Sequence, residues 1–434
     1  MAHVTESTSV SAAPGLSAPA PAALPPLETK RSFVREHLNL AKMGWRAATE
    51  LSFKALWKAG YLYGWKGFKA IRAYKKRLKK DELYPPFMFI ALTNTCNLRC
   101  HGCWVEKEGT AHYLTPEDLD RIIVSGKRRN AYYYTLLGGE PFMYKGLLDI
   151  VARHRDCYFQ VITNGMFFNE QTVARLRELG NVTPLISLDG YQGQNDLRRG
   201  EGVWEAAQKG LARLKQAGIM FGVATTATGK NMTEVMSDDY VRHFIQAGAQ
   251  YIWYYVYRPM SPEPHFEYCV GKEQLLWFRR RLLELRRTQP IFVIDTYWTA
   301  TGEAFCPAAT GLGFHIGPQG SIEICPALSF ARETVRDAED LYPVINESPF
   351  LRGFQQFVKE RTKGCVILEY PQQLHDFIKD AGARDYSGRG TAFAELNGIT
   401  PRHSQHLAGE EIPEDFWFYR ILKSQVFFGM GAIS

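Results

Sequence analysis

The chain has 434 residues, of which 45% are hydrophobic and 22% charged, with eight cysteines and a formal net charge of +7. This is the composition of a globular protein with a hydrophobic core, and eight cysteines in such a length are too few for a disulfide-stapled scaffold. The length suits two or three domains, or one large catalytic domain with extensions.

The positive charge is concentrated near the N-terminus. Between Lys30 and Lys80 there are fifteen Lys and Arg against two acids, Glu36 and Glu50, so this segment carries +13 and the rest of the chain −6. Residues 1–30 are rich in Ala, Pro, Ser and Thr and predict a disordered leader. They lack the charged start and apolar run of a secretory signal, so we predict none.

Residues 31–85 predict a basic, amphipathic helical extension, in which aromatic residues are interspersed among Lys and Arg. No apolar run reaches the roughly 20 residues needed to span a bilayer, and four glycines weaken the helix. Aromatic rings at headgroup level and cations facing anionic lipid favour a helix lying in the plane of a membrane. Packing of this segment on the body with a solvated basic face remains an alternative, and we expect no nucleic-acid partner.

From residue 86 the pattern becomes an alternation of strands and helices. Thr115 as N-cap and Pro116 at the first helical position mark the first helix. Repeated βα units predict an α/β fold, a partial (β/α)6 barrel of the TIM type, with its chemistry at the C-terminal ends of the strands. The predicted strands are 87–92, 132–137, 158–163, 183–188, 221–226, 252–257 and 291–295, and the predicted helices are 115–129, 147–154, 170–179, 203–217, 237–247 and 271–287.

The rest of the chain predicts a smaller region and a tail. Residues 300–370 read as loop-rich with spaced cysteines, followed by a helix over 369–380. An aromatic tail, which either closes the barrel or packs as core, contains Phe416 to Tyr419, then Phe427 and Phe428. The predicted units are a leader (1–30), the basic extension (31–85), the barrel (86–298), the cysteine-bearing region (299–380) and the tail (381–434).

The first predicted strand runs directly into a loop with the spacing Cys-x3-Cys-x2-Cys, at Cys96, Cys100 and Cys103. Three thiolates in one loop can ligate three irons of a [4Fe–4S] cube and leave the fourth iron open to a ligand. A structural zinc site would need a fourth protein ligand, and His101, the nearest candidate, lies inside the loop. The loop therefore resembles that of the radical S-adenosylmethionine (SAM) superfamily.

The resemblance implies that SAM chelates the open iron and is cleaved reductively to a 5′-deoxyadenosyl radical, which abstracts hydrogen from a substrate. Gly138-Gly139-Glu140-Pro141, after the second strand, resembles the family motif that binds the SAM amino group. By itself this motif would be a turn with a chance acid. Its position after the cysteine loop makes the combination specific.

Ser187 and Asp189 end the fourth strand, and Asn195 to Gly200 follow. Together these segments resemble the stretch of radical SAM enzymes that carry a C-terminal auxiliary-cluster domain, with Asn195 where that family often has His. The resemblance implies that Ser187 and Asp189 lie near the SAM ribose and that Arg199 binds the SAM carboxylate, whose geometry a guanidinium matches. A solvated pair of arginines at 198 and 199 is the alternative.

A second set of cysteines has the pattern Cys306-x13-Gly320-x4-Cys325, with Cys365 further on. The pattern resembles the opening of SPASM and twitch domains, although the later cysteine run of a full SPASM domain is missing. The resemblance implies one auxiliary iron–sulfur cluster on Cys306, Cys325 and Cys365, with Cys269 or His315 as possible fourth ligands. Buried structural thiols are the alternative.

The leading hypothesis is a radical SAM enzyme acting on a hydrophobic, membrane-associated substrate, where the substrate part rests on the basic aromatic segment and the tail. The alternatives are a peptide-modifying radical SAM maturase and a non-catalytic iron–sulfur electron carrier. The resemblance also implies an external electron donor such as flavodoxin or ferredoxin. Thiols at metal-ligand spacing favour a reducing, cytoplasmic location, with a peripheral position at the inner face of the membrane as an option.

Overall fold

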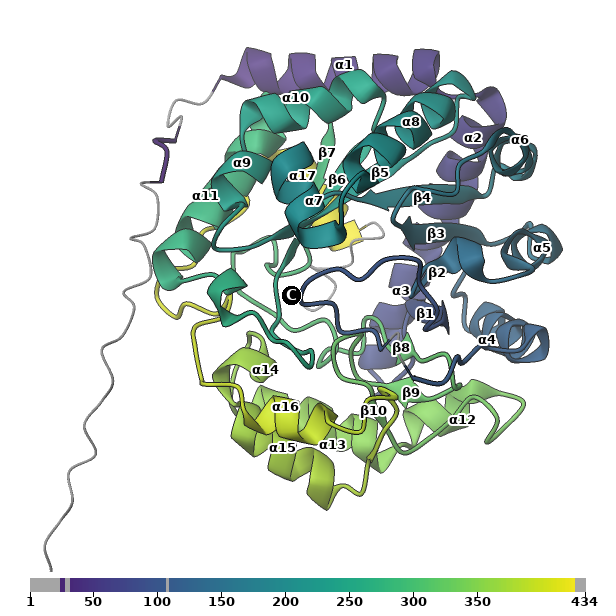
Figure 1. The fold of residues 1–434 in the computed structure, drawn as a ribbon, viewed down its shortest axis with the longest axis vertical. Helices are drawn as coiled ribbons and strands as arrows, with labels where there is room; N and C mark the ends of the chain where they lie inside the picture. The colour runs from purple at the N-terminus through teal and green to yellow at the C-terminus, as the bar shows by residue number, and fades with distance from the viewer. Residues whose placement is uncertain (1–23, 28–31, 107–108, 426–434) are drawn as a thin grey trace, which may run out of the picture.

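The computed structural model describes residues 24–27, 32–106 and 109–425, and its centre is an open, curved sheet wrapped by helices (Figure 1). The nine strands of this sheet have the order β7-β6-β5-β4-β3-β2-β1-β8-β9. All neighbouring pairs are parallel except β8 and β9. The strands are β1 (Phe87–Thr93), β2 (Tyr133–Gly138), β3 (Tyr158–Thr163), β4 (Val182–Ser187), β5 (Gly222–Ala227), β6 (Tyr251–Val256), β7 (Phe292–Ile294), β8 (His315–Ile316) and β9 (Ile322–Glu323).

A crossover helix follows each strand from β1 to β6 and covers the outside of the sheet, so the predicted partial barrel is confirmed (Figure 1). The hydroxyl of Thr115 accepts a hydrogen bond from the amide of Asp118 (3.1 Å), as expected of an N-cap. The helices are α4 (Pro116–Arg128), α5 (Leu147–Arg153), α6 (Glu170–Leu179), α8 (Val203–Gln216), α10 (Asp238–Ala247) and α11 (Lys272–Thr288), with shorter α7 (Gln192–Arg199) and α9 (Met232–Val235) between them.

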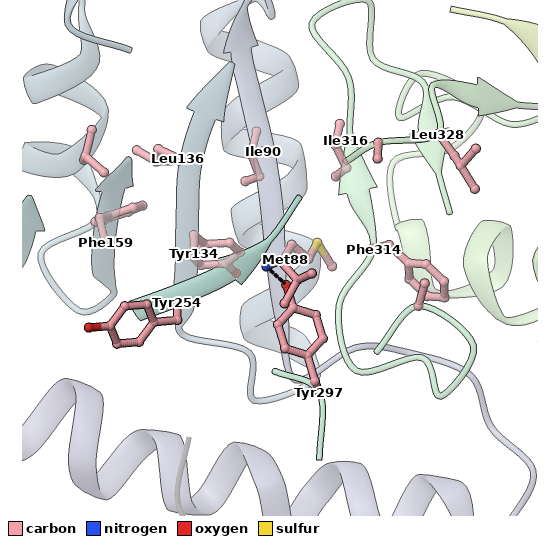
Figure 2. Packing of buried hydrophobic residues seen from close by; sticks show 14 of the residues in the cluster. Met88, Ile90, Tyr134, Leu136, Phe159, Tyr254, Tyr297, Phe314, Ile316 and Leu328 are labelled. Carbon is pink, nitrogen blue, oxygen red and sulfur yellow. Dashed lines mark hydrogen bonds between the residues drawn. The ribbon is translucent and has the colours of Figure 1, made fainter. Parts of the chain in front are cut away.

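Alternate residues of each strand face the helices and form the main core. Ile90 of β1 lies in register with Leu136 on one side and Ile316 on the other, so the core continues across β8 (Figure 2). The strand predicted at 291–295 is β7, whereas β8, which adds a further parallel strand beside β1, was not predicted.

The basic N-terminal segment forms helices α1 (Phe33–Glu50), α2 (Phe53–Lys58) and α3 (Lys66–Leu78), with the π-helical turn η1 (Ala59–Trp65) between α2 and α3. Of the four glycines expected to weaken the helix, two lie in this turn and none ends α1. Leu62 packs on the inner face of the sheet, against a cluster that includes Tyr133, Tyr158 and Tyr251 at the starts of their strands.

These helices are tied to the base of the barrel, where the strands begin. Arg46 donates to the carbonyls of Pro290 (3.0 Å) and Ala249 (2.9 Å), in the loops before β7 and β6, and to that of Ile245 (3.1 Å) in the last turn of α10. Lysines of α2 and α3 donate to further backbone carbonyls in the same way: Lys54 to that of Glu178 at the end of α6, and Lys58 and Lys66 to those of Arg155 and Asp156 in the loop before β3. The alternative of packing on the body is therefore confirmed for the inner side of this segment.

The region after β7 is more regular than the loop-rich stretch predicted for 300–370. Ser348 caps a helix that begins at Pro349 and buries Phe350, Phe354 and Phe357 against the body. The elements here are α12 (Leu341–Asn346), α13 (Pro349–Lys359), α14 (Val366–Glu369), α15 (Pro371–Asp380), α16 (Ala392–Asn397) and the small antiparallel sheet β10 (Phe330–Ala331) with β11 (Arg384–Asp385).

Both predicted terminal segments are partly described. Residues 24–27 of the expected leader lie against α11, where the indole of Trp277 donates to the carbonyl of Pro25 (2.8 Å). The aromatic tail forms α17 (Trp417–Gln425), with Phe416 and Tyr419 buried in the body, while Phe427 and Phe428 lie outside the described residues. In the described ranges, no helix is both long and apolar enough to cross a membrane.

We expect the substitution Arg46→Ala to lower the free energy of unfolding by about 3 kcal/mol, because it leaves three partly buried carbonyls without their charged donor. Lys42→Ala, at an exposed position of the same helix, should change it by less than about 0.5 kcal/mol. Chemical denaturation followed by circular dichroism measures both, and equal stabilities would contradict the role of Arg46 as the tie between α1 and the barrel.

Candidate active site

The three predicted cluster cysteines lie in the loop that follows β1, at the C-terminal end of the barrel. Cys96, Cys100 and Cys103 are all half-buried, and none of them forms a disulfide. The amide of Cys103 donates to the carbonyl of Cys100 (3.3 Å), so the second half of the loop is a tight turn. Gly102 has φ +66°, and a Cβ there would come within 2.4 Å of the Tyr257 hydroxyl. Tyr257, after β6, therefore packs directly on the cysteine loop.

Residues from neighbouring strand ends hold the same loop. The side chain of Asn164, after β3, donates to the side chain of Asn97 (2.7 Å). The amide of His101 donates to the carbonyl of Arg198 (2.8 Å), and the ring of His101 stacks on that of His265 (5.3 Å between centroids). The turn that follows β3, with Asn164, is thus part of the site.

The glycines of the Gly138–Pro141 motif serve close backbone packing. A Cβ on Gly138 would lie 2.2 Å from the carbonyl oxygen of Thr93, and one on Gly139 would lie 2.1 Å from that of Thr95. The amide of Glu140 donates to the Thr95 carbonyl (2.8 Å). The group that approaches these glycines most closely is the backbone at the start of the cysteine loop. The motif therefore fixes the loop to β2.

Glu140 is almost fully buried and accepts three hydrogen bonds. They come from the hydroxyl of Thr163 (2.7 Å) and from the amides of Asn164 (2.8 Å) and Phe142 (3.0 Å). Burial raises the pKa of this carboxyl to about 7, although these donors and the charge of Arg199 oppose the rise. A cation beside Glu140 would offset the cost of ionising it.

Asp189 forms the charged centre of the site. Its buried carboxylate pairs with Arg198 and Arg199 (Nε–Oδ2 2.7 Å for Arg199) and accepts the amide of Thr226 (2.7 Å). Burial opposes ionisation, but the two guanidinium groups hold the pKa of Asp189 below its usual value. Arg198 and Arg199 are nine-tenths buried, so the alternative of a solvated arginine pair is wrong.

The two arginines face different groups. Arg198 lies close to Cys100 and Cys103. Burial alone would lower the pKa of this arginine, but the charges of Asp189 and of the two cysteines raise it. Its Nε is buried without a hydrogen-bond partner among the described atoms. The charge of Arg199 acts on Glu140. The sequence singled out Arg199, yet Arg198 is the cation that approaches the cysteines.

Asn195, which replaces the expected His, has a positioning role. Its side-chain oxygen accepts the amide of Asp189 (3.1 Å), and its side-chain nitrogen donates to Asp196 (3.1 Å). Asp196 in turn accepts the amides of Gly202 (3.1 Å) and Trp204 (2.9 Å). Ser187 is the last residue of β4 and lies in register with Ala224 of β5. These contacts orient α7, and with it both arginines, over the strand ends.

The second set of cysteines also converges. Cys306 and Cys325 are half-buried. Loss of solvent raises the pKa values of their thiols to about 11 and about 12, and the neighbouring Cys365 acts on both. Arg258, two residues beyond the end of β6, donates from Nε to the sulfur of Cys365 (3.0 Å) and from Nη2 to Gln405 (3.1 Å). No local sequence pattern predicts an arginine beside these cysteines.

The two candidate fourth ligands differ in their surroundings. Cys269 lies near Arg258, which together with Arg402 opposes the rise that burial causes in its pKa. His315 is instead engaged through Nδ1 by Glu323 (2.6 Å), and its Nε2 has no hydrogen-bond partner among the described atoms. His315 lines a pocket beside the cysteine loop, together with Thr93, Trp104, His112 and Tyr386.

Within the described ranges, no three His, Cys, Asp or Glu residues are grouped closely enough for a single metal ion. The ligands of a [4Fe–4S] cube bind separate irons, so they are spaced more widely than those of one ion. Three thiols on one loop, next to a buried arginine, are a donor set that fits such a cluster. The auxiliary thiols, with Arg258 beside them, fit a second one in the same way.

Comparison with known proteins decides the family of this region. Residues 90–241 match the model of the radical SAM superfamily. These residues form a radical SAM domain. The superfamily uses a [4Fe–4S] cluster and SAM, and its members require an external reductant. The matched span covers the cysteine loop and the strand ends that carry Glu140 and Asp189.

Relatives of known name agree with this assignment. The sporulation killing factor maturation protein SkfB of Bacillus subtilis is 32% identical over 177 residues, which cover 39% of this chain and 42% of that protein. An AdoMet-dependent heme synthase of Oleidesulfovibrio alaskensis is 27% identical over 341 residues, or 70% of this chain and 84% of that protein. The matched part of this chain therefore spans about two fifths of the length of SkfB.

A similar fold is found in Streptococcus suis SuiB, solved bound to its precursor peptide SuiA. The two structures superpose with a TM-score of 0.55 over 68% of this chain and 72% of that chain, at 17% sequence identity. The superposition extends beyond the radical SAM domain, and at this identity it shows the shared fold alone.

We expect the substitution Gly139→Ala to displace the cysteine loop, because the new Cβ would lie 2.1 Å from a backbone oxygen. The free energy of unfolding should fall by about 2 kcal/mol or more, the cost of strain at a backbone contact, and iron content after anaerobic reconstitution should fall. Gly193→Ala is the matched control, since no atom lies within 4 Å of its Cβ position. Full iron loading of Gly139→Ala would contradict the proposed contact.

Proposed function

We propose that the chain is a radical SAM enzyme that modifies a peptide and carries one auxiliary iron–sulfur cluster. The observation that supports the enzyme class is the convergence of the cysteine loop, Glu140 and the Asp189 ion pairs at one end of the barrel. Bound there, the cluster and SAM supply a 5′-deoxyadenosyl radical that abstracts hydrogen from the substrate. A non-catalytic electron carrier has no need of such a set.

Each group has a role in this proposal. Cys96, Cys100 and Cys103 hold the cluster, and Arg198 offsets their negative charge in the buried site. Glu140 accepts the ammonium of SAM, and Gly138, Gly139 and Pro141 set its position. Arg199 extends its remaining N–H groups toward the SAM carboxylate while Asp189 fixes its Nε. Ser187 lies at the edge of this pocket, near the expected ribose.

The peptide substrate is proposed from the comparisons and from the architecture. SkfB is named as a maturation protein, and SuiB has been solved with a precursor peptide. The membrane-associated, hydrophobic substrate that we expected is not supported, because the aromatic N-terminal segment lies at the base of the barrel rather than at its mouth. Contact with a membrane is thus a separate question from the choice of substrate.

A pocket between the cysteine loop and the C-terminal region offers a place for such a substrate. It contains an unpaired acceptor or donor, His315 Nε2, whose tautomer is set by Glu323 on the other ring nitrogen. Arg389 joins the two walls, since it donates to the carbonyl of Trp104 (2.5 Å) directly after Cys103. Backbone amides of a peptide could pair with these polar groups.

A tetrapyrrole is the second candidate substrate, because the alignment with the heme synthase covers 70% of this chain. Anaerobic incubation with SAM, a flavodoxin or ferredoxin as electron donor, and either precursor peptides encoded near the gene or iron coproporphyrin distinguishes the two. A mass change in a peptide, with 5′-deoxyadenosine formed in equal amount, supports the maturase. Turnover of the porphyrin alone would replace it.

We expect Cys100→Ala to abolish reductive cleavage of SAM without unfolding the protein, because the thiol is half-buried in a loop outside the core. Cys157→Ala is the control, since Cys157 is buried in the core far from either set of cysteines in the fold, at the start of β3. Chromatographic assay of 5′-deoxyadenosine from SAM and dithionite measures both. Cleavage retained by Cys100→Ala would exclude the cluster assignment.

The auxiliary cluster has its own test. Wild-type protein should bind about eight irons after anaerobic reconstitution, and Cys325→Ala about four, with SAM cleavage retained. Iron and sulfide counting gives these values directly. If wild-type protein binds about four irons, then Cys306, Cys325 and Cys365 are structural thiols.

The proposed role of Glu140 predicts a pH dependence. Without SAM the pKa of this carboxyl is raised to about 7 by burial, and the ammonium of SAM prefers the ionised form. The Kd for SAM should therefore fall as the pH rises from about 6 to 8, by up to roughly tenfold per unit below the pKa. Calorimetry in buffers of different ionisation enthalpy should detect proton release. Glu140→Gln should bind more weakly and without this dependence, whereas an unchanged profile would contradict the role.

A further inference from the structure

The outer side of the N-terminal helices is an exposed apolar face. Within the described residues, nine of the sixteen exposed large apolar side chains lie between positions 33 and 65. On α1 the stripe contains Val34, Leu38 and Trp45, and Trp45 is 71% exposed. The face continues over α2 and η1 with Phe53 (82% exposed), Leu56, Trp57 (61%), Tyr61 and Trp65 (51%).

The polarity of α1 is inverted relative to an ordinary surface helix, which buries its apolar stripe. The side that faces the body carries Glu36, Asn39 and Arg46 beside a single buried apolar residue, Met43, and it is held by polar bonds such as that from Asn39 to the carbonyl of Arg287 (2.7 Å). The spacing of Val34, Leu38 and Trp45 places them together on the opposite side. The fold therefore exposes the apolar side chains of α1 to solvent and places mostly polar side chains between α1 and the body.

The exposed charges that the N-terminal helices themselves contribute have a single sign. Between residues 32 and 80 the exposed side chains include eight cations and no acid, because Glu36 is buried and Glu50 is paired with Arg46. On α3 the stripe becomes cationic, with Lys69 over the ring of Trp65 (5.0 Å) and Arg72 over that of Phe68 (5.4 Å). The exposed cations are Arg35, Lys42, Lys54, Lys69, Arg72, Lys76, Lys79 and Lys80.

We propose that this aromatic and cationic face, formed by α1, α2, η1 and the start of α3, docks on an anionic bilayer surface. In-plane membrane helices combine Trp, Phe and Leu with Lys and Arg in this way, and anionic headgroups complement a face without acids. The interfaces of protein partners, in contrast, are depleted of Lys at their cores. The proposal does not depend on the chemistry at the other end of the barrel.

The position of the face determines how the protein lies on the membrane. Its helices contact the loops that precede β3, β6 and β7, at the base of the barrel. The cysteine loop follows β1 at the opposite ends of the strands. Docking through this face therefore leaves the mouth of the barrel, and the pocket beside the cysteine loop, open to the aqueous side.

The test is co-sedimentation of the reconstituted full-length protein with phosphatidylcholine vesicles, with and without about one third phosphatidylglycerol. We expect binding to the anionic vesicles that falls as salt is raised from about 0.1 to 1 M. Trp45→Ser/Phe53→Ser/Trp57→Ser should weaken binding at least about tenfold. Val124→Ser/Leu197→Ser, which removes exposed apolar side chains elsewhere, should have no effect.

Two charge-reversal variants test the contribution of the lysines. Lys69→Glu/Lys76→Glu should reduce binding strongly, whereas Lys359→Glu/Lys379→Glu, at exposed positions of α13 and α15, should not. Failure of the wild type to sediment with anionic vesicles would overturn the proposal, as would equal binding by the triple Ser variant. A dimer seen by light scattering that the triple variant loses, without vesicle binding, would assign the face to a second copy of the chain instead.

Discussion

The buried carboxylate of Asp189 is the interaction on which the mouth of the barrel depends. It pairs with Arg198 and Arg199 and accepts the amide of Thr226, so one side chain joins the ends of β4 and β5 to α7. Arg198 also contacts the cysteine loop: its carbonyl accepts the amide of His101, and its guanidinium lies close to the thiols of Cys100 and Cys103. Because a buried charge that loses its partner costs several kcal/mol, these groups form one unit rather than separate sites.

The parts of the fold that could be predicted from the sequence are those with local signals. Apolar runs predicted the ends of the barrel strands to within one or two residues. Thr115 correctly predicted the start of its helix, because its hydroxyl caps the first turn. The cysteine spacing and Glu140 identified the site, since both lie next to a strand end. The helix α13 was missed although Ser348 and Pro349 start it and Phe350, Phe354 and Phe357 follow at helical spacing. The two-residue strands β8 and β9 have no such signal, because their pairing with β1 and with each other is set by tertiary contacts.

Other features could not be read from local patterns because distant groups determine them. The sequence placed Gly138 and Gly139 near a ligand, whereas the chain itself, at Thr93 and Thr95, occupies that space. Arg258 joins the auxiliary cysteines only through the packing of β6 against the C-terminal region. In α1 the periodicity predicts an amphipathic helix but not its orientation. Carbonyls of the loops before β6 and β7 select the polar side, and this choice leaves Trp45 outside.

The separation between the two ends of the barrel constrains the function more than either end alone. An enzyme that draws an apolar substrate from a bilayer needs its mouth at the lipid surface, yet here the aromatic residues gather where the strands begin. The groups around the mouth include polar and charged side chains, among them Glu140, Arg199 and His315, beside apolar ones such as Trp104 and Val105. A substrate rich in hydrogen-bonding groups matches that lining, since a buried polar group left without a partner costs about 1–3 kcal/mol. A peptide satisfies this requirement along its whole backbone, and a membrane at the base of the barrel would leave its path to the site open.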